Sequence, residues 1–183
     1  MKKSVLLLLA MLSVMLLCSC VRTGEKDSVD FLSSMMKSGF DCKIEETVND
    51  AVLRESCYIN GCKLSLYSNS QGKLVKVGVT YYAENSGGFQ ALSRAAVSSF
   101  CSFSNEDINA VFKALEIADK LPDDSRGVKQ CDTEWYGFAF SCDEVGGTLV
   151  IRSYRSEPTS APEVTLNTTV PFVRIDLSEK ASS

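Results

Sequence analysis

The sequence predicts an α+β domain, in which an antiparallel sheet is covered on one face by about three helices. Several segments alternate apolar and polar residues, as half-buried strands do, and turn-forming pairs such as Asn60-Gly61 separate them. Other segments repeat apolar residues every three or four positions, which is typical of helices that pack on one side. The fold class therefore follows from two different hydrophobic periods in one chain of 183 residues.

The first helix is expected to begin at Asp27 or Ser28, because either side chain can cap a helix N-terminus. Gly39 is expected to end it, since glycine is favoured just beyond the last helical turn. The apolar residues expected on its buried side are Val29, Leu32 and Met36, with Phe31 and Met35 alongside.

Two further helices are expected in the middle of the chain. One covers residues 89–100, and the other begins at Ser104, which forms a capping-box pattern with Asp107. We expect the last helix to continue to Leu121, because Pro122 cannot continue it.

Six segments have the strand pattern. It is clearest over residues 73–83, where Val75, Val77, Val79 and Tyr81 are expected to face the core. Residues 156–183 contain many Ser, Thr and Pro residues and are expected to form a tail, with an edge strand over 164–166 and 170–177 as one alternative. The expected strands cover residues 40–48, 63–67, 73–83, 127–132, 134–143 and 147–154, while residues 51–60 are ambiguous and a further strand there is one alternative.

Two stretches, residues 60–77 and 136–152, resemble each other. Each has a strand that starts at a glycine (Gly61 or Gly137), a loop that ends in a glycine, and a second strand. One hypothesis is a helix followed by strands, used twice, with an extra helix between the two copies. Chance similarity is the alternative, because all hairpins share turn chemistry.

The first nineteen residues have the pattern of a secretory signal. Lys2 and Lys3 precede an apolar run of thirteen residues, 5–17, that only Ser13 interrupts. This run is shorter than the ~20 residues that a membrane-spanning helix needs. The expected organisation is a signal over 1–19, a tether over 20–26, one domain over 27–155 and a tail over 156–183.

The segment Leu17-Cys18-Ser19-Cys20 resembles the lipobox of bacterial lipoproteins. The resemblance implies cleavage between Ser19 and Cys20, diacylglycerol on the sulfur of Cys20, and a further acyl chain such as palmitate on the new amino group. It also implies attachment to the cell membrane on its extracytoplasmic face. Cys18 departs from the small or hydroxylated residue that is commoner at its position. An ordinary cleaved signal and an uncleaved anchor are the alternatives.

Composition argues against several classes of function. Removing Lys2 and Lys3 with the signal changes the formal net charge from −4 to −6, which opposes binding to nucleic acid. The chain has no histidine, which excludes Ser-His-Asp and Cys-His catalysis and the usual zinc and iron sites. We therefore expect no cofactor and no metal.

Six of the eight cysteines remain after Cys18 leaves with the signal and Cys20 accepts lipid. An even number in an exported chain indicates up to three disulfides, with fifteen possible connectivities. Buried free thiols are one alternative, and a zinc site at Cys57 and Cys62 is another. The six disulfide candidates are Cys42, Cys57, Cys62, Cys101, Cys131 and Cys142.

The favoured hypothesis for function is a membrane-anchored binding module for a protein, peptide or cell-wall ligand. The face of the sheet away from the helices would present aromatic side chains, and the candidates are Tyr82, Trp135 and Tyr136. Trp135 is equally well explained as a core residue.

Two alternatives remain open from the sequence. One is an envelope assembly factor or inhibitor that docks on another protein through an exposed apolar patch or sheet edge. The other is a carboxylate-based hydrolase, which needs two acids across a cleft. The carboxylates available by type are Glu45, Glu46, Asp143 and Glu144, without a motif.

Overall fold

The structure, a computed structural model, describes residues 25–82, 88–117, 127–155 and 173–174. The signal, Cys20, most of the tether and nearly all of the tail lie outside the described residues. Tests of the lipid anchor and of the proposed cleavage site therefore come from experiment.

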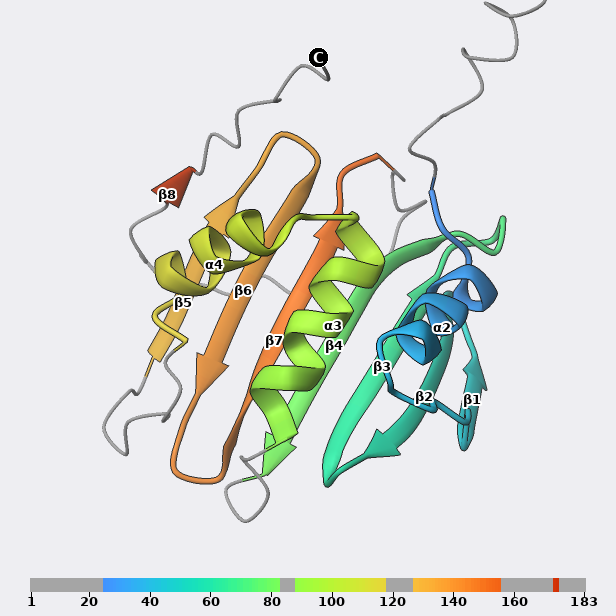
Figure 1. The fold of residues 1–183 in the computed structure, drawn as a ribbon. Coiled ribbons are helices and arrows are strands. Elements are labelled where there is room, and N and C mark those ends of the chain that lie inside the picture. The colour runs from blue at the N-terminus through green and yellow to red at the C-terminus, as the bar shows by residue number, and fades with distance from the viewer. Residues whose placement is uncertain (1–24, 83–87, 118–126, 156–172, 175–183) are drawn as a thin grey trace, which may run out of the picture.

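One sheet organises the described chain (Figure 1). Its strand order is β1-β2-β3-β4-β7-β6-β5-β8. All neighbouring strands are antiparallel except β5 and β8, which are parallel. The strands are β1 (Glu46–Asn49), β2 (Leu53–Ile59), β3 (Cys62–Ser68), β4 (Leu74–Tyr82), β5 (Gly127–Asp132), β6 (Tyr136–Cys142), β7 (Gly146–Ser153) and β8 (Val173–Arg174).

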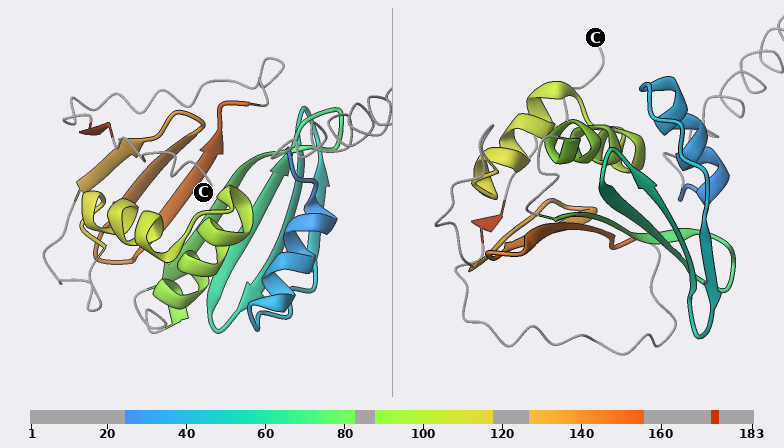
Figure 2. Two further views of the ribbon diagram at one scale, coloured as in Figure 1. Left: turned by 45° about the horizontal axis from the view of Figure 1, so that its top comes forward. Right: turned by 90° about the horizontal axis from the view of Figure 1, so that it is seen from below.

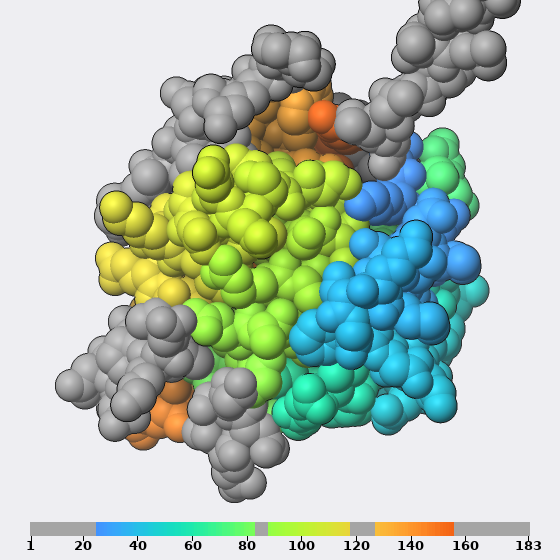
Figure 3. Space-filling view, in the orientation of Figure 1, coloured from blue at the N-terminus to red at the C-terminus, as the bar shows by residue number. Residues whose placement is uncertain are grey.

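Three helices, α2 (Ser28–Lys37), α3 (Phe89–Cys101) and α4 (Asn105–Ala114), lie on one side of this sheet. Figure 2 shows them together above the sheet, and Figure 3 shows their side chains forming a continuous surface over it. The α+β class and the one-sided helical cover are therefore confirmed. The other side of the sheet, which carries none of these helices, is called the open face below.

The core lies between the helices and the sheet. Leu64, Val79, Leu149 and Phe140 are successive cross-strand partners on β3, β4, β7 and β6, and each is nearly inaccessible to solvent. Because side chains alternate between the two faces of a strand, every second residue beside this row also points toward the helices.

Helix α2 begins as expected but buries a different side. Asp27 caps it by accepting a hydrogen bond from the Asp30 amide at 2.9 Å. Phe31 and Met35 are fully buried, whereas Val29 and Met36 are 72% and 62% exposed. The prediction that Val29 and Met36 face the core is wrong, because packing on the sheet fixes the rotation of the helix.

Helix α4 has the predicted capping box at Ser104 and Asp107, but it ends at Ala114 rather than at Leu121. Glu116 adopts a left-handed conformation with φ +54°, which breaks the helical backbone. Ile117 beyond it is still buried. The apolar pattern therefore continues past the helix because the following residues also pack on the core.

Two strand predictions need correction. The first strand begins at Glu46 rather than at residue 40. A register shift at Tyr67 and Ser68 makes Val75 an extra residue in β4, so Leu74 is buried in place of Val75. The turn at Asn60-Gly61 is confirmed, with φ +50° and +77° as in a two-residue hairpin.

The two halves of the sheet have the same strand order. Strands β2-β3-β4 and β5-β6-β7 are both antiparallel meanders, and the last strand of each lies at the centre, where β4 pairs with β7. The two similar stretches of sequence form the equivalent hairpins β3-β4 and β6-β7.

The ends of α2 and α4 also match. The Phe40 amide donates to the Met35 carbonyl at 3.0 Å, and the Ile117 amide donates to the Phe112 carbonyl at 2.9 Å. Ile117 lies 77 positions after Phe40, and Phe112 lies 77 positions after Met35, so the two hydrogen bonds have the same spacing in the chain. These correspondences support the duplication hypothesis, with α3 as the extra helix.

Candidate ligand-binding face

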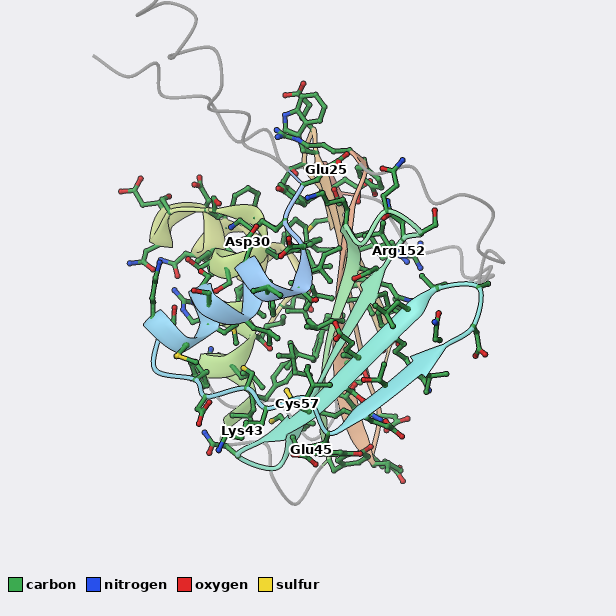
Figure 4. The ribbon with its side chains drawn as sticks, turned by 90° about the vertical axis from the view of Figure 1, so that its right-hand side faces the viewer. Glu25, Asp30, Lys43, Glu45, Cys57 and Arg152 are labelled. Atoms are coloured by element: carbon green, nitrogen blue, oxygen red, sulfur yellow. The ribbon has the colours of Figure 1, made fainter. Side chains whose placement is uncertain are left out.

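The open face carries its side chains in rows that cross the strands. Arg54 of β2 is opposite Tyr67 of β3, Tyr67 is opposite Lys76 of β4, and Lys76 is opposite Arg152 of β7. Directly opposed residues share a face, so these four side chains form one row, here called the basic row. Figure 4 shows Arg152 on the side of the sheet away from the helices.

A row of small residues lies beside the basic row, two positions along each strand. It consists of Ser56, Ser65, Gly78, Val150 and Ala139. Their short side chains make a low floor on the open face.

A row of longer and hydroxylated side chains lies on the other side of this floor. It consists of Tyr58, Lys63, Thr80, Thr148 and Ser141. The Thr80 and Thr148 hydroxyls are 3.0 Å apart and hydrogen-bonded, and the Lys63 ammonium is 3.0 Å from a Glu46 carboxylate oxygen. On the open face, the small residues therefore lie between the basic row and a row that is rich in hydroxyl groups.

Electrostatics distinguish the basic row from the rest of this face. The Lys76 ammonium lies 3.7 Å from the centre of the Tyr67 ring, a cation–π contact. Burial lowers the pKa of Lys76, and the positive charges of Arg152 and Arg54 lower it further. Within the described residues, none of these three cations forms an ion pair.

The carboxylate of this row is Asp132 on β5, two strands beyond Arg152. It hydrogen-bonds Tyr154, and burial together with Asp132 raises the pKa of Tyr154 to about 12. Asp132 lies two strand intervals, about 10 Å, from Arg152, and the charge of Arg54 lowers the pKa of the Glu46 carboxyl group, so the three cations are compensated only in part.

A cavity of about 350 Å³ lies beside the row of Thr80, Thr148 and Ser141, where β4 and β6 end and β5 and β7 begin. Tyr82, one of the predicted binding residues, lines it and is 45% exposed. Other lining residues on the open face are Thr80, Val128, Ser141 and Thr148.

The other two predicted aromatics do not join Tyr82. Trp135 is 41% exposed. The Arg155 guanidinium lies over its indole ring, with the guanidinium carbon 4.3 Å from the ring centre. Trp135 precedes β6 at the opposite end of the sheet from Tyr82, about 23 Å away along β7 at the usual rise of a strand. The three aromatics therefore do not form one surface.

Tyr136 belongs to the core rather than to a binding surface. Its ring packs edge-on against Phe100 and Phe103, with centroid distances of 5.7 and 5.6 Å. Burial raises the pKa of its hydroxyl.

The carboxylates named by type do not converge. Glu45 and Glu46 lie at the β1 edge, while Asp143 and Glu144 lie in the β6-β7 turn, at least about 19 Å away along the sheet at the usual strand spacing. Lys63 and Ser56 lower the pKa of Glu46, the opposite of what a general acid needs. The hydrolase alternative gains no support from this arrangement.

The six cysteines of the domain carry free thiols in the structure. Cys42 and Cys57 are in hydrogen-bonding contact, and Cys57 lies on β2 near Lys43 and Glu45 (Figure 4). Cys62 and Cys142 share one row of the sheet, but Tyr81 and Gly147 separate them. Three strand intervals, about 14 Å, exceed the reach of a disulfide.

The described residues hold no cluster of three or more potential metal ligands. None of the helices described is long and apolar enough to cross a membrane. Comparison with protein-family models, curated proteins and solved structures finds no match for this chain.

Sequence reasoning did not find the basic row. Arg54, Lys76 and Arg152 are visible as polar positions of alternating strands, but they are far apart in the chain. Only the pairing of β4 with β7 brings Arg152 beside Lys76.

Proposed function

We propose that the chain is a lipid-anchored binding module of a bacterial cell envelope, and that its ligand lies on the open face of the sheet. The arrangement of that face carries the proposal. All three described helices lie on the opposite side, while the open face presents aromatic, cationic and hydroxylated side chains around a low floor.

The anchor is supported by the signal-like segment that ends at Cys20. Each buried methylene of an acyl chain contributes ~0.8 kcal/mol to membrane binding, so two or three chains hold a protein durably. The lipid thereby leaves the protein surface free for a ligand.

Metabolic labelling with an alkyne analogue of palmitate tests the anchor. Wild-type protein should be labelled and sediment with membranes, and Cys20→Ser should abolish the label. Cys18→Ser is the matched control and should be labelled normally. Labelling of the Cys20→Ser protein would contradict the anchor.

Site-specific photo-cross-linking in intact cells tests the binding face. Benzophenone-bearing phenylalanine at position 82 should give an adduct of defined mass, because Tyr82 lines the cavity of the open face. The same residue at position 36 is the control, since Met36 is similarly accessible but lies on a helix on the other side.

An adduct at position 36 with none at position 82 would contradict binding on the open face. It would favour the assembly-factor alternative, in which the exposed Val29 and Met36 side chains of α2 dock on another protein.

A further inference from the structure

We propose that the basic row binds an acidic polysaccharide, whose carboxylates contact Arg54, Lys76 and Arg152 while its sugar rings lie along the adjoining floor. This inference rests on the proposed function, because it names the class of ligand for the same open face. The argument uses the spacing of the cations, the absence of an ion pair to them from the described residues, and the chemistry of the rows beside them.

The spacing favours an extended ligand over a small anion. Arg54, Lys76 and Arg152 stand on β2, β4 and β7, so the row crosses three strand intervals, or about 14 Å. A single phosphate or sulfate is much smaller than this span. A polymeric ligand that carries negative charges at intervals can contact Arg54, Lys76 and Arg152 together.

The charge balance of the row favours an anionic ligand. Three cations lie near one another, and Lys76 is half-buried between the other two with its ammonium over Tyr67. Like charges at short range repel, and within the described residues no ion pair relieves them. The planar guanidinium groups of Arg54 and Arg152 match carboxylate geometry, because each can donate two parallel hydrogen bonds.

The neighbouring rows favour sugar over an apolar chain. The floor beside the cations is made of small side chains, and Ser65, Val150 and Ala139 are partly exposed, so a ring can approach the sheet there. Ser65 is on this floor, and the Thr80 and Thr148 hydroxyls lie beyond it and can donate to or accept from sugar hydroxyls.

The overall charge selects among polyanions. The chain has a formal net charge of −4, so a densely charged polymer such as nucleic acid is repelled by the rest of the surface. A glycan with one carboxylate per sugar can pair with the cations of the basic row and has a lower charge density than nucleic acid.

Calorimetric titration of the full chain in neutral detergent with a hexamer of galacturonic acid tests the proposal. Maltohexaose is the neutral control and hexaglutamate the acidic peptide control. We expect binding of the galacturonate hexamer that weakens with added salt, and little binding of the other two.

Single substitutions Arg54→Gln, Lys76→Gln and Arg152→Gln should each weaken binding of the galacturonate hexamer about tenfold, as expected for loss of a hydrogen bond to a charged group. Lys43→Gln is the matched control, because the Lys43 side chain is 85% exposed and lies outside the row. It should bind within about twofold of wild type. Unfolding midpoints measured by circular dichroism identify any variant that fails to fold, and Arg152→Lys should then retain intermediate affinity.

Three outcomes would overturn the proposal: equal affinity in all three row variants, an equal loss in Lys43→Gln, or tighter binding of hexaglutamate or maltohexaose. None of these would remove the photo-adduct at position 82. Failure of the acidic polysaccharide is thus distinguishable from failure of the binding face itself.

Discussion

Oxidation should join Cys42 to Cys57 and stabilise the domain. The thiol of Cys57 hydrogen-bonds Cys42 and lowers its pKa, whereas burial and the same contact raise the pKa of Cys57. Cys42 is only partly buried. The Cys42 thiolate is therefore the nucleophile that attacks an external disulfide, and Cys57 completes the exchange.

The size of the effect follows from the loop that the bond closes. Cys57 lies 15 positions after Cys42, and a cross-link of that span restricts the unfolded chain by ~3 kcal/mol. The bond would also fix the segment between α2 and β1 to the sheet, where Glu45 already pairs with Ser56 through a backbone hydrogen bond of 2.9 Å.

Urea unfolding before and after treatment with oxidised glutathione measures this stabilisation. One molecule of oxidised glutathione takes up the two electrons and two protons and leaves as two reduced molecules. Wild-type protein should gain ~3 kcal/mol on oxidation and lose it in dithiothreitol. Cys42→Ser should show no such gain, whereas Cys131→Ser should keep it.

Two results would refute this reasoning. The first is a peptide map of the oxidised protein with six free thiols in the domain or with Cys42 bonded to a different cysteine. The second is a redox-dependent stability that persists in Cys42→Ser.

Three further predictions concern other parts of the fold. Leu149→Ala should destabilise the domain by about 3 kcal/mol in urea unfolding, because Leu149 is fully buried at the centre of the sheet; a loss below 1 kcal/mol would contradict that placement. Gly137→Ala should lower the pKa of Tyr154 from about 12 toward 10 in an ultraviolet titration, because the new methyl group would overlap the Tyr154 hydroxyl and displace it; an unchanged titration would show that the ring does not cover Gly137. Lys63→Met should raise the pKa of Glu46, because Lys63 lowers it in the wild-type protein, and an NMR titration of the Glu46 carboxyl group measures this change. Since the Glu46 pKa lies below its ordinary 4.5 in the folded state, this contact stabilises the fold above that pH and is lost as the pH falls through the lowered pKa; an unshifted Glu46 pKa in Lys63→Met would refute the assignment.

Local chemistry made several elements predictable. The Ser104–Asp107 capping box satisfies backbone groups within one turn, and Asn60-Gly61 supplies the two left-handed residues of a tight hairpin. Neither depends on distant parts of the chain. The alternation of apolar and polar residues along β3 and β4 likewise indicated which segments form strands.

Packing made other features unpredictable. Apolar residues surround much of α2, so their spacing alone allowed more than one buried side, and contact with the sheet selected Phe31 and Met35. The apolar pattern after α4 continued beyond the helix because Leu115 and Ile117 are buried outside it.

The sequence by itself determined the α+β class, the hairpins and helix starts, the six cysteines of the domain and the absence of histidine chemistry. These follow from residue type and from contacts between near neighbours. Only the tertiary structure decided that Lys76 lies beside Arg152 and that Cys42 touches Cys57. Lys76 and Arg152 meet through the pairing of β4 with β7, two strands about 70 residues apart, and no local pattern encodes such a long-range register.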